Sequence, residues 1–366
     1  MKFCLSLIAL LLAPAAMLAQ GSATTSVRKV GVGLYGSNGH QIPASKFVNH
    51  PHAVLVAVAG PQKNPPSENV KRYATLDELL SDSAVELVSL CSPRRADQVR
   101  DAIRCLEAGR HVYAEKPSAL TEADLDLILA TARRAGRQFH EMAGTAFTPH
   151  YGAMRQLVRE GAIGEVVQVF VQKSYRYGQR RPQDEAIDGG MFLQAGIHAA
   201  RLVEHVSGVR IKSLTGAETR FGSPESGDGK TAATAQAVLE NGGLATIILN
   251  YLNPAGTPLP HGNETLRIFG TKGFIESDEG GARTRLVTPG NIAPLPPVTG
   301  IDYFDSFLAN LAAGAPMPLT LEEELHPLRL LLRAKEDLRA NGANLTGKRP
   351  RAMHPKLSFA GDGPNR

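Results

Sequence analysis

The chain has 366 residues, of which 43% are hydrophobic and 20% are charged, and this composition excludes wholesale disorder. The net charge is +5, but the basic residues are scattered and tryptophan is absent, so a nucleic-acid partner is not favoured. The length predicts two domains.

The N-terminal segment differs from the rest of the chain. Lys2 precedes an apolar run at 3–12, and mostly small residues then lead to Ala19. This pattern is typical of a secretory signal peptide, residues 1–19, and predicts an exported, periplasmic protein. The run is too short to span a bilayer comfortably, so we expect no stable membrane insertion, with an uncleaved N-terminal anchor as the alternative.

Two cysteines, Cys91 and Cys105, remain once Cys4 leaves with the signal. Export permits a disulfide, but two thiols give no framework, and two inert buried thiols are the preferred interpretation. No spacing of cysteine and histidine indicates a metal site.

Apolar strands alternate with helices in the predicted first domain, residues 27–147. The strands are expected at 27–35, 54–59, 85–92, 111–115 and 138–143. The run at 54–59 is continuously apolar, as in a strand buried on both faces. A short helix is expected at Ile42-Pro43, and further helices after a capping box at Thr75, from Pro93 to Ala108, and from Thr121 to Gly136. This alternation predicts a doubly wound parallel α/β sheet of Rossmann type, with the ligand beyond the carboxyl ends of its strands.

The pattern changes in the predicted second domain, residues 148–350. A long alternating strand at 166–177 precedes a helix near 191–206 and two hairpins, which turn at 241–243 and 270–272. Consecutive hairpins predict an antiparallel sheet and therefore an α+β domain. A proline-rich loop at 289–297 precedes a final helix, which Thr320 caps and which we expect Pro327 to kink.

A glycine-rich turn follows the first strand. The glycines at 31, 33 and 36 fit G-x-G-x-x-G, but this register leaves too short a strand before it. We place the phosphate turn at Gly36-Ser37-Asn38-Gly39-His40, where glycines let the backbone approach a pyrophosphate. Asn38 and Gln41 replace two glycines of the motif, so a plain strand–helix turn is an equal alternative.

The end of the second strand bears on the choice of cofactor. It has no acidic residue to bind the ribose hydroxyls of NAD, while Lys63 follows closely. A nearby cation suits a 2′-phosphate, so NADP is slightly favoured over NAD. The alternative is a solvated loop lysine.

Glu115-Lys116-Pro117 closes the fourth strand. A residue before proline is held extended, and we expect Lys116 to point into the cleft. There it can hydrogen-bond a substrate hydroxyl and carry its proton while hydride passes to a nicotinamide. The alternative is a structural lysine paired with Glu115 or another carboxylate.

The segment Glu107–Pro117 (EAGRHVYAEKP) resembles the "L-x-A-G-[KR]-H-V-x-x-E-K-P" signature of Gfo/Idh/MocA oxidoreductases. Agreement continues at Ser92-Pro93, 160–164, 188–190, 196–198 and 269–273. The resemblance implies NAD(P)-linked oxidation or reduction of sugars, inositols or related polyols, and a large open antiparallel sheet that often forms homo-oligomers. It also implies a catalytic Lys116, often before a cis bond, and we place Ser92, Pro93 and Glu115 at the cofactor.

The helix of the second domain departs from the family pattern D-x-G-x-H-x-x-D. Gln194 and Arg201 replace its aspartates, whereas His198 is retained as a candidate general base with a pKa near working pH. Gln194, one helical turn from His198, can hydrogen-bond substrate but cannot raise the basicity of His198. The alternative is a buried histidine with a satisfied partner.

Tyr175 and Arg176 end the first long strand of the second domain, beside Tyr177 and Arg180. They are candidates to contact hydroxyls or a carboxylate of the substrate. Exposed strand-end residues without a function are the slightly preferred interpretation.

Two functions follow. The leading one is an NAD(P)-dependent oxidoreductase acting on a sugar-like alcohol, with Lys116 polarising the oxygen and His198 transferring the proton. Export complicates this function, because free nicotinamide cofactor is scarce outside the cytoplasm. Enzymes that carry the cofactor there usually fold around it first and use a twin-arginine signal, and this leader has no arginine pair. The alternative is an exported carbohydrate-binding protein or a non-redox hydrolase or lyase on the same fold.

Overall fold

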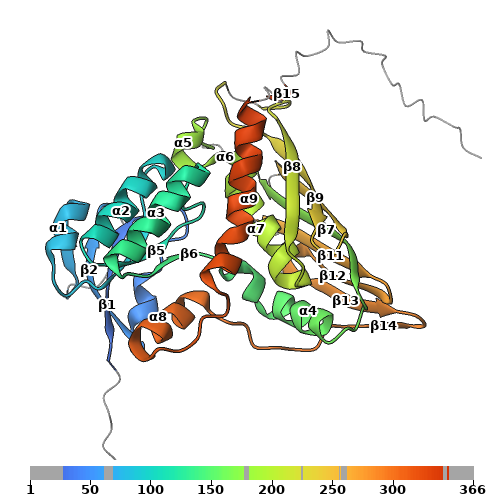
Figure 1. Cartoon of the computed structure of the whole chain (residues 1–366), viewed down its shortest axis with the longest axis horizontal. Coiled ribbons are helices and arrows are strands. Elements are labelled where there is room, and N and C mark those ends of the chain that lie inside the picture. Colours follow the sequence, from blue (N-terminus) through green and yellow to red (C-terminus); the bar gives the residue numbers. More distant parts are fainter. Residues whose placement is uncertain are drawn as a thin grey trace, which may run out of the picture.

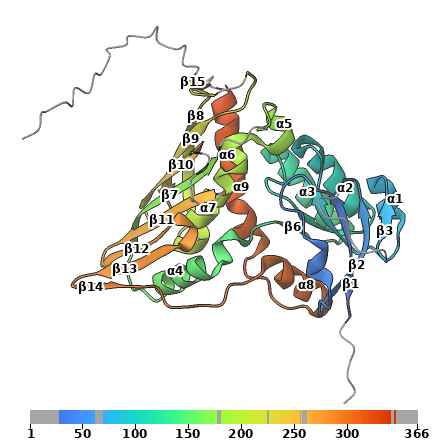
Figure 2. The same cartoon turned by 180° about the vertical axis from the view of Figure 1, so that it is seen from behind.

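The computed structural model describes residues 28–61, 69–176, 181–223, 226–254, 256, 262–340 and 344–345. The predicted signal peptide and Lys63 lie outside these ranges. The described residues form two lobes, each built on one sheet, with helix α9 (Leu321–Ala340) between them (Figure 1 and Figure 2). Among them, no helix has the length and apolar character needed to span a membrane.

The first lobe holds a six-stranded sheet in the order β3-β2-β1-β4-β5-β6, with every pair parallel. Its strands are β1 (Val30–Gly36), β2 (Ala53–Ala59), β3 (Lys71–Tyr73), β4 (Leu87–Cys91), β5 (His111–Ala114) and β6 (Phe139–Glu141). The order confirms the predicted Rossmann-type domain. Strand β3 was not predicted, because its sequence Lys-Arg-Tyr carries no apolar pattern.

Helices from distant parts of the chain cover the two faces of this sheet. One face packs against α1 (Leu76–Ser81), α2 (Gln98–Glu107) and α3 (Glu122–Ala135). After Pro43 the chain forms only a four-residue 3-10 helix, η1 (Ala44–Phe47). The opposite face is therefore completed by α8 (Tyr303–Ala313), which comes from the C-terminal part of the chain and buries Phe304 and Phe307 there.

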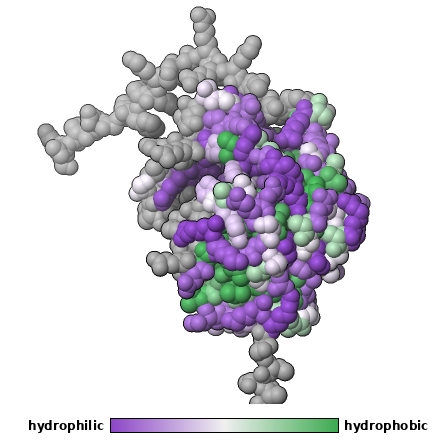
Figure 3. All heavy atoms as spheres, turned by 90° about the vertical axis from the view of Figure 1, so that its left-hand side faces the viewer, coloured by the Kyte–Doolittle hydropathy of each residue, from purple (hydrophilic) through white to green (hydrophobic). Residues whose placement is uncertain are grey.

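The surface of the first lobe is mainly hydrophilic when viewed from its own side, with apolar side chains gathered in the lower part (Figure 3). The large exposed apolar side chains of this lobe are Val48, Val54 and Leu127. Exposure of Val54 contradicts the prediction that residues 54–59 are buried on both faces. The reason is that β3 pairs only with Ala57–Ala59, which leaves the first half of β2 at a sheet edge.

The second lobe holds a nine-stranded sheet in the order β14-β13-β12-β11-β7-β10-β9-β8-β15. Its strands are β7 (Val166–Arg176), β8 (Ile211–Thr219), β9 (Ala232–Leu239), β10 (Leu244–Asn253), β11 (Gly262–Gly270), β12 (Gly273–Asp278), β13 (Arg283–Thr288), β14 (Asn291–Ala293) and β15 (Asn344–Leu345). Most pairs are antiparallel, as predicted, but β7 pairs with β10 and β8 with β15 in parallel. The proline-rich segment contains β14, so it is not wholly a loop.

One face of this sheet is covered by helices, and the opposite face carries none of the described helices (Figure 1). The remaining helices of this lobe are α4 (Pro149–Arg159), α5 (Glu185–Asp188), α6 (Gly190–Gln194), α7 (Gly196–Arg201) and a π-helical turn at Leu202–Val206. The uncovered face exposes Val238, Leu244 and Leu252.

Pro327 lies within α9, which is 20 residues long and continues past the proline. A proline lacks the N–H that would bond the carbonyl four residues earlier. That carbonyl, of Glu323, instead lies 2.9 Å from Nε2 of His205 on the π-helical turn. The second lobe thus satisfies the backbone group that Pro327 leaves unpaired.

Candidate active site

Lys116 follows strand β5 at the carboxyl end of the first sheet, and its peptide bond to Pro117 is cis. The side chain is buried, and Nζ donates a hydrogen bond of 3.0 Å to the carbonyl oxygen of Gln194 in the second lobe. Burial lowers the pKa of Lys116 to about 8, against an opposing effect of the Glu115 charge. Lys116 therefore spans the junction of the lobes and binds a carbonyl instead of a carboxylate.

His198 approaches the same junction from helix α7. Its Nδ1 lies 2.9 Å from the hydroxyl of Thr145, and its Nε2 is buried without a hydrogen-bond partner among the described residues. Burial and the neighbouring charges of Lys116 and Lys173 hold the pKa of His198 well below its usual value. The expectation of a pKa near working pH is therefore wrong, and His198 is neutral at pH 7. If Nδ1 donates to Thr145, Nε2 offers a lone pair to a ligand.

Glu115 connects this site to the predicted phosphate turn. Its Oε1 lies 2.9 Å from Nδ1 of His40, and its Oε2 is buried without a partner in the part of the chain described. Burial tends to raise the pKa of Glu115, but the hydrogen bond with His40 and the charge of Lys116 outweigh it and hold that pKa below its usual value. A Cβ on Gly39 would lie 2.5 Å from Oε1, so the turn needs glycine there.

Strand β1 ends at Gly36, which agrees with the register that places the turn at residues 36–40. Two amide side chains stand where the family motif has glycines. Asn38 donates to the carbonyl oxygens of Pro93 and of Ile187 in the second lobe, at 3.0 and 2.7 Å. Gln41 donates to the carbonyls of Tyr35, Gly36 and Ser89. These amides tie the turn to neighbouring backbone.

Several predicted site residues lie differently from expectation. The hydroxyl of Ser92 is buried and donates to Asp101 at 2.8 Å, so it does not face a ligand. Gln194 ends α6 while His198 belongs to α7, so they do not share one helix, and Oε1 of Gln194 lies 3.4 Å from the Tyr251 hydroxyl.

Tyr175 is buried, which contradicts the preferred interpretation of an exposed strand-end residue. Its ring lies 6.1 Å from that of Tyr251, while Arg176, the last residue of β7, is partly buried. Tyr177 and Arg180 fall outside the described residues. Cys91 and Cys105 are buried and form no disulfide, in agreement with two inert thiols.

A dinucleotide fits the residues at these strand ends. Gly36 ends β1 and Gly60 directly follows β2, both with positive φ, and a Cβ on Gly60 would lie 3.7 Å from the backbone nitrogen of Gly36. The two unpartnered atoms, Oε2 of Glu115 and Nε2 of His198, provide polar contacts for a ligand. The turn at 36–40, Pro93 and Glu115 would hold the cofactor, whereas η1 is too short to bind phosphate by its dipole.

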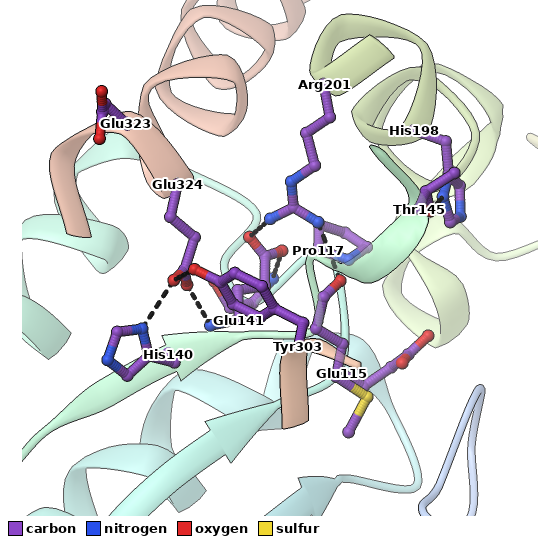
Figure 4. A network of polar contacts seen from close by, with 12 residues as sticks. Glu115, Pro117, His140, Glu141, Thr145, His198, Arg201, Tyr303, Glu323 and Glu324 are labelled. Atoms are coloured by element: carbon purple, nitrogen blue, oxygen red, sulfur yellow. Dashed lines mark hydrogen bonds and ion pairs between the residues drawn. The ribbon is translucent and has the colours of Figure 1, made fainter. Parts of the chain in front are cut away.

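A second set of buried charges lies beside Pro117 (Figure 4). Arg201 binds Glu141 of β6 at 2.8 Å and also donates to the carbonyl of Met142. Glu324 of α9 accepts from the backbone N–H of Glu141 and from Tyr303, and lies 2.6 Å from Nδ1 of His140. Burial raises the pKa of Glu141 to about 7, although Arg201 opposes this. Arg201, which replaces a family aspartate, thus joins the two lobes.

The sequence interpretation missed Thr145, Glu141 and Lys173. Thr145 and Glu141 carry no pattern that marks them. Lys173 does carry one, because it continues the inward-facing series of Val169 and Val171 on β7, and a charge on a buried strand face is unusual. Among the described residues no cluster of three or more histidine, cysteine or acidic side chains is arranged to hold a metal.

Fold and site together define an NAD(P)-dependent oxidoreductase acting on alcohol groups, and comparison with known proteins identifies the family. Residues 27–142 match the model described as "Oxidoreductase family, NAD-binding Rossmann fold", and residues 151–276 match the "GFO/IDH/MocA C-terminal domain". The chain therefore belongs to the Gfo/Idh/MocA family of oxidoreductases.

Individual relatives are distant. The trans-1,2-dihydrobenzene-1,2-diol dehydrogenase of Bos taurus is 29% identical over 64% of this chain and 68% of its own length. The 2,7-anhydro-N-acetylneuraminate hydratase of Escherichia coli is 26% identical over 68% of this chain and 66% of its own. A structure of an oxidoreductase from Thermotoga maritima superposes with a TM-score of 0.76 at 25% identity, covering 85% of this chain and 98% of that one.

Proposed function

We propose that the protein transfers hydride between NAD(P) and an alcohol carbon of a sugar, inositol or related polyol. The observation that carries this is the meeting of two buried groups from different lobes. Lys116 binds the carbonyl of Gln194, four residues before His198, while Nε2 of His198 has no partner among the described residues. A donor and a neutral base are the two groups that oxidation of a hydroxyl requires.

In the proposed reaction, a bound nicotinamide supplies the acceptor or donor of hydride. Lys116 is charged below its pKa of about 8. Its ammonium group has three N–H donors, and one of them binds the carbonyl of Gln194, so two remain to polarise the substrate oxygen. His198 takes the hydroxyl proton at Nε2 during oxidation and returns it during reduction. Thr145 holds the imidazole ring in place through Nδ1.

The test measures reduction of NAD⁺ and NADP⁺ with myo-inositol, D-glucose and D-xylose by wild type, Lys116→Met and His198→Asn. We expect turnover by wild type with at least one polyol, and its loss in both variants. Absence of nucleotide binding, or turnover unchanged in Lys116→Met, contradicts the proposal.

A non-redox reaction on the same fold is the second candidate, because one relative is named a hydratase. In this chain Gln194 and Arg201 stand where the family has aspartates. The non-redox reaction would be favoured if the protein converted a sugar without net oxidation or reduction of the nicotinamide and if Lys116→Met kept this activity.

We infer a slight preference for NADP from the absence of an acidic side chain at the end of β2, where Ala59 and Gly60 stand. Lys63 supplies a nearby cation in the sequence. Titration of NADPH and NADH by nucleotide fluorescence is expected to show tighter NADPH binding, and Lys63→Ala to lose the difference. Lys71→Ala, on β3, is the matched control.

We further propose that the protein is exported to the periplasm and forms a homo-oligomer through the uncovered face of the nine-stranded sheet. The leader at 1–19 supports export, and exposed Leu244 and Leu252 support association. Fractionation of the native host, with nucleotide analysis of the purified protein, tests the first. Light scattering of wild type and Leu252→Glu tests the second, with a smaller species expected for the variant.

A further inference from the structure

Lys173 is buried on the helix-covered face of β7, where the apolar Val169 and Val171 precede it on the same face. It forms an ion pair with Glu264, the residue opposite it on β11. The hydroxyl of Tyr151 on α4 donates to the other oxygen of Glu264 at 2.9 Å. Burying two charges costs more than packing apolar residues of the same volume, so stability alone does not account for this pair.

The pair lies beside the candidate active site. On β10, the residue opposite Lys173 is Leu249, and a Cβ on Gly196 would lie 3.4 Å from the Leu249 side chain. Helix α7 therefore crosses the sheet at this point, two residues before His198. The charge of Lys173 also contributes to the lowered pKa of His198.

A continuous series of polar and aromatic side chains leads from Lys173 to Lys116. Nζ of Lys173 lies 5.2 Å from the centre of the Tyr175 ring, and that ring lies 6.1 Å from Tyr251. The hydroxyl of Tyr251 lies 3.4 Å from Gln194, whose carbonyl accepts from Lys116. Both lysines lie near His198, since the charge of each lowers the pKa of that histidine.

We propose that Lys173 is a substrate-binding residue, which donates a hydrogen bond to an oxygen on the carbon next to the one that is oxidised. An ammonium group has three donors, and Glu264 occupies one. Because Glu264 neutralises the charge, the pair suits a hydroxyl better than a carboxylate. The inference rests on the proposed function and narrows it to neutral substrates with two adjacent hydroxyls.

The test compares two probes that differ by one hydroxyl, trans-1,2-cyclohexanediol and cyclohexanol. Wild type is expected to oxidise the diol with a kcat/KM about 10- to 100-fold higher, the effect of one well-placed hydrogen bond. In Lys173→Met the ratio of kcat/KM for the diol to kcat/KM for cyclohexanol is expected to fall to near one. The value for the diol falls, while the value for cyclohexanol changes little. A purely structural role would lower both values equally, and an unchanged ratio or an equal loss overturns the inference.

Two further variants keep the test decisive if Lys173→Met does not fold. Glu264→Gln leaves the ammonium charge without its counter-ion, and we expect preference to shift about tenfold toward trans-2-hydroxycyclohexanecarboxylate. Tyr151→Phe keeps both charges and is the matched control, with the diol preference retained. A preference that Glu264→Gln leaves unchanged overturns the inference.

Inactivity of wild type toward both probes would count against the proposed function and not by itself against Lys173. Calorimetry with trans-1,2-cyclohexanediol and NADP⁺-loaded protein then decides. Binding that weakens at least tenfold in Lys173→Met supports the inference, whereas equal binding, or none in either protein, overturns it.

Discussion

Two groups of buried charges lie at the junction of the lobes, and they differ in how completely their acceptor atoms are paired, while Nε of Arg201 also lacks a partner among the described residues. Around Arg201, every carboxylate oxygen of Glu141 and Glu324 is within hydrogen-bond distance of a donor group. Around Lys116, one oxygen of Glu115 and Nε2 of His198 have no partner among the described residues. An unpaired buried acceptor is costly, so the second group is organised for a ligand, whereas the first, with its carboxylate oxygens paired, holds the lobes together.

The departure at position 201 belongs to the first group. Arg201 stands where the resemblance places an aspartate, and it forms an ion pair across the junction with Glu141 on β6. Substitutions in the group around Lys116 are therefore expected to lower activity, and substitutions in the group around Arg201 are expected to lower stability.

The largest effect is expected for Lys116→Met. Loss of the donor that polarises the substrate oxygen is expected to lower kcat by about 10²- to 10⁴-fold. The unfolding temperature, measured by circular dichroism, is expected not to fall, because the variant removes a buried charge. Lower stability with activity retained would reverse the assignment of the two groups.

Arg201→Met is expected to show the opposite result. It leaves the Glu141 carboxylate buried without its counter-ion and is expected to lower the free energy of unfolding by about 3–5 kcal/mol at alkaline pH, where the carboxyl is charged. Without Arg201 the pKa of Glu141 lies above its wild-type value of about 7, so the carboxyl takes up a proton as the pH falls through that higher pKa and the loss is expected to shrink. Denaturant titrations at several pH values measure this.

The double variant Arg201→Met/Glu141→Gln is the control for that prediction. It removes both charges, and we expect it to recover most of the lost stability. A double variant as unstable as Arg201→Met would mean that the loss comes from packing and not from the unpaired carboxylate.

The pH dependence of oxidation sharpens the role of Lys116. Its charged form exists below a pKa of about 8 and is lost as the pH rises through that value. We expect kcat/KM to fall about tenfold per pH unit above 8, as the donor disappears. A rise through the same range would mean that neutral lysine, and not His198, accepts the proton.

The smallest effect is expected at Thr145, which contacts the ring of His198. Thr145→Val removes one hydrogen bond and is expected to lower kcat/KM about 5- to 10-fold, corresponding to about 1 kcal/mol. Thr145→Ser keeps the hydroxyl and is expected to retain activity. Equal losses in the two variants would indicate packing instead of ring orientation.

Much of the first lobe was predictable, because its signals are local. The capping box at Thr75 and the left-handed Gly136 appear where the sequence places them. The sequence from β5 to Pro117 likewise placed Lys116 at a strand end. The turn after β1 and the short helix after Pro43 were both located, and residues 303–313 cover the face that a longer helix would occupy.

The sequence by itself determined the succession of strands and helices, the family, and the strand-end position of Lys116, since periodicity and motifs depend on residues close together in the chain. Only the tertiary structure decided which groups face one another. Arg201 meets Glu141, Thr145 meets His198, and Glu264 meets Lys173 across 60, 53 and 91 positions respectively. Such contacts follow from how helices and sheets pack, and no local pattern encodes them.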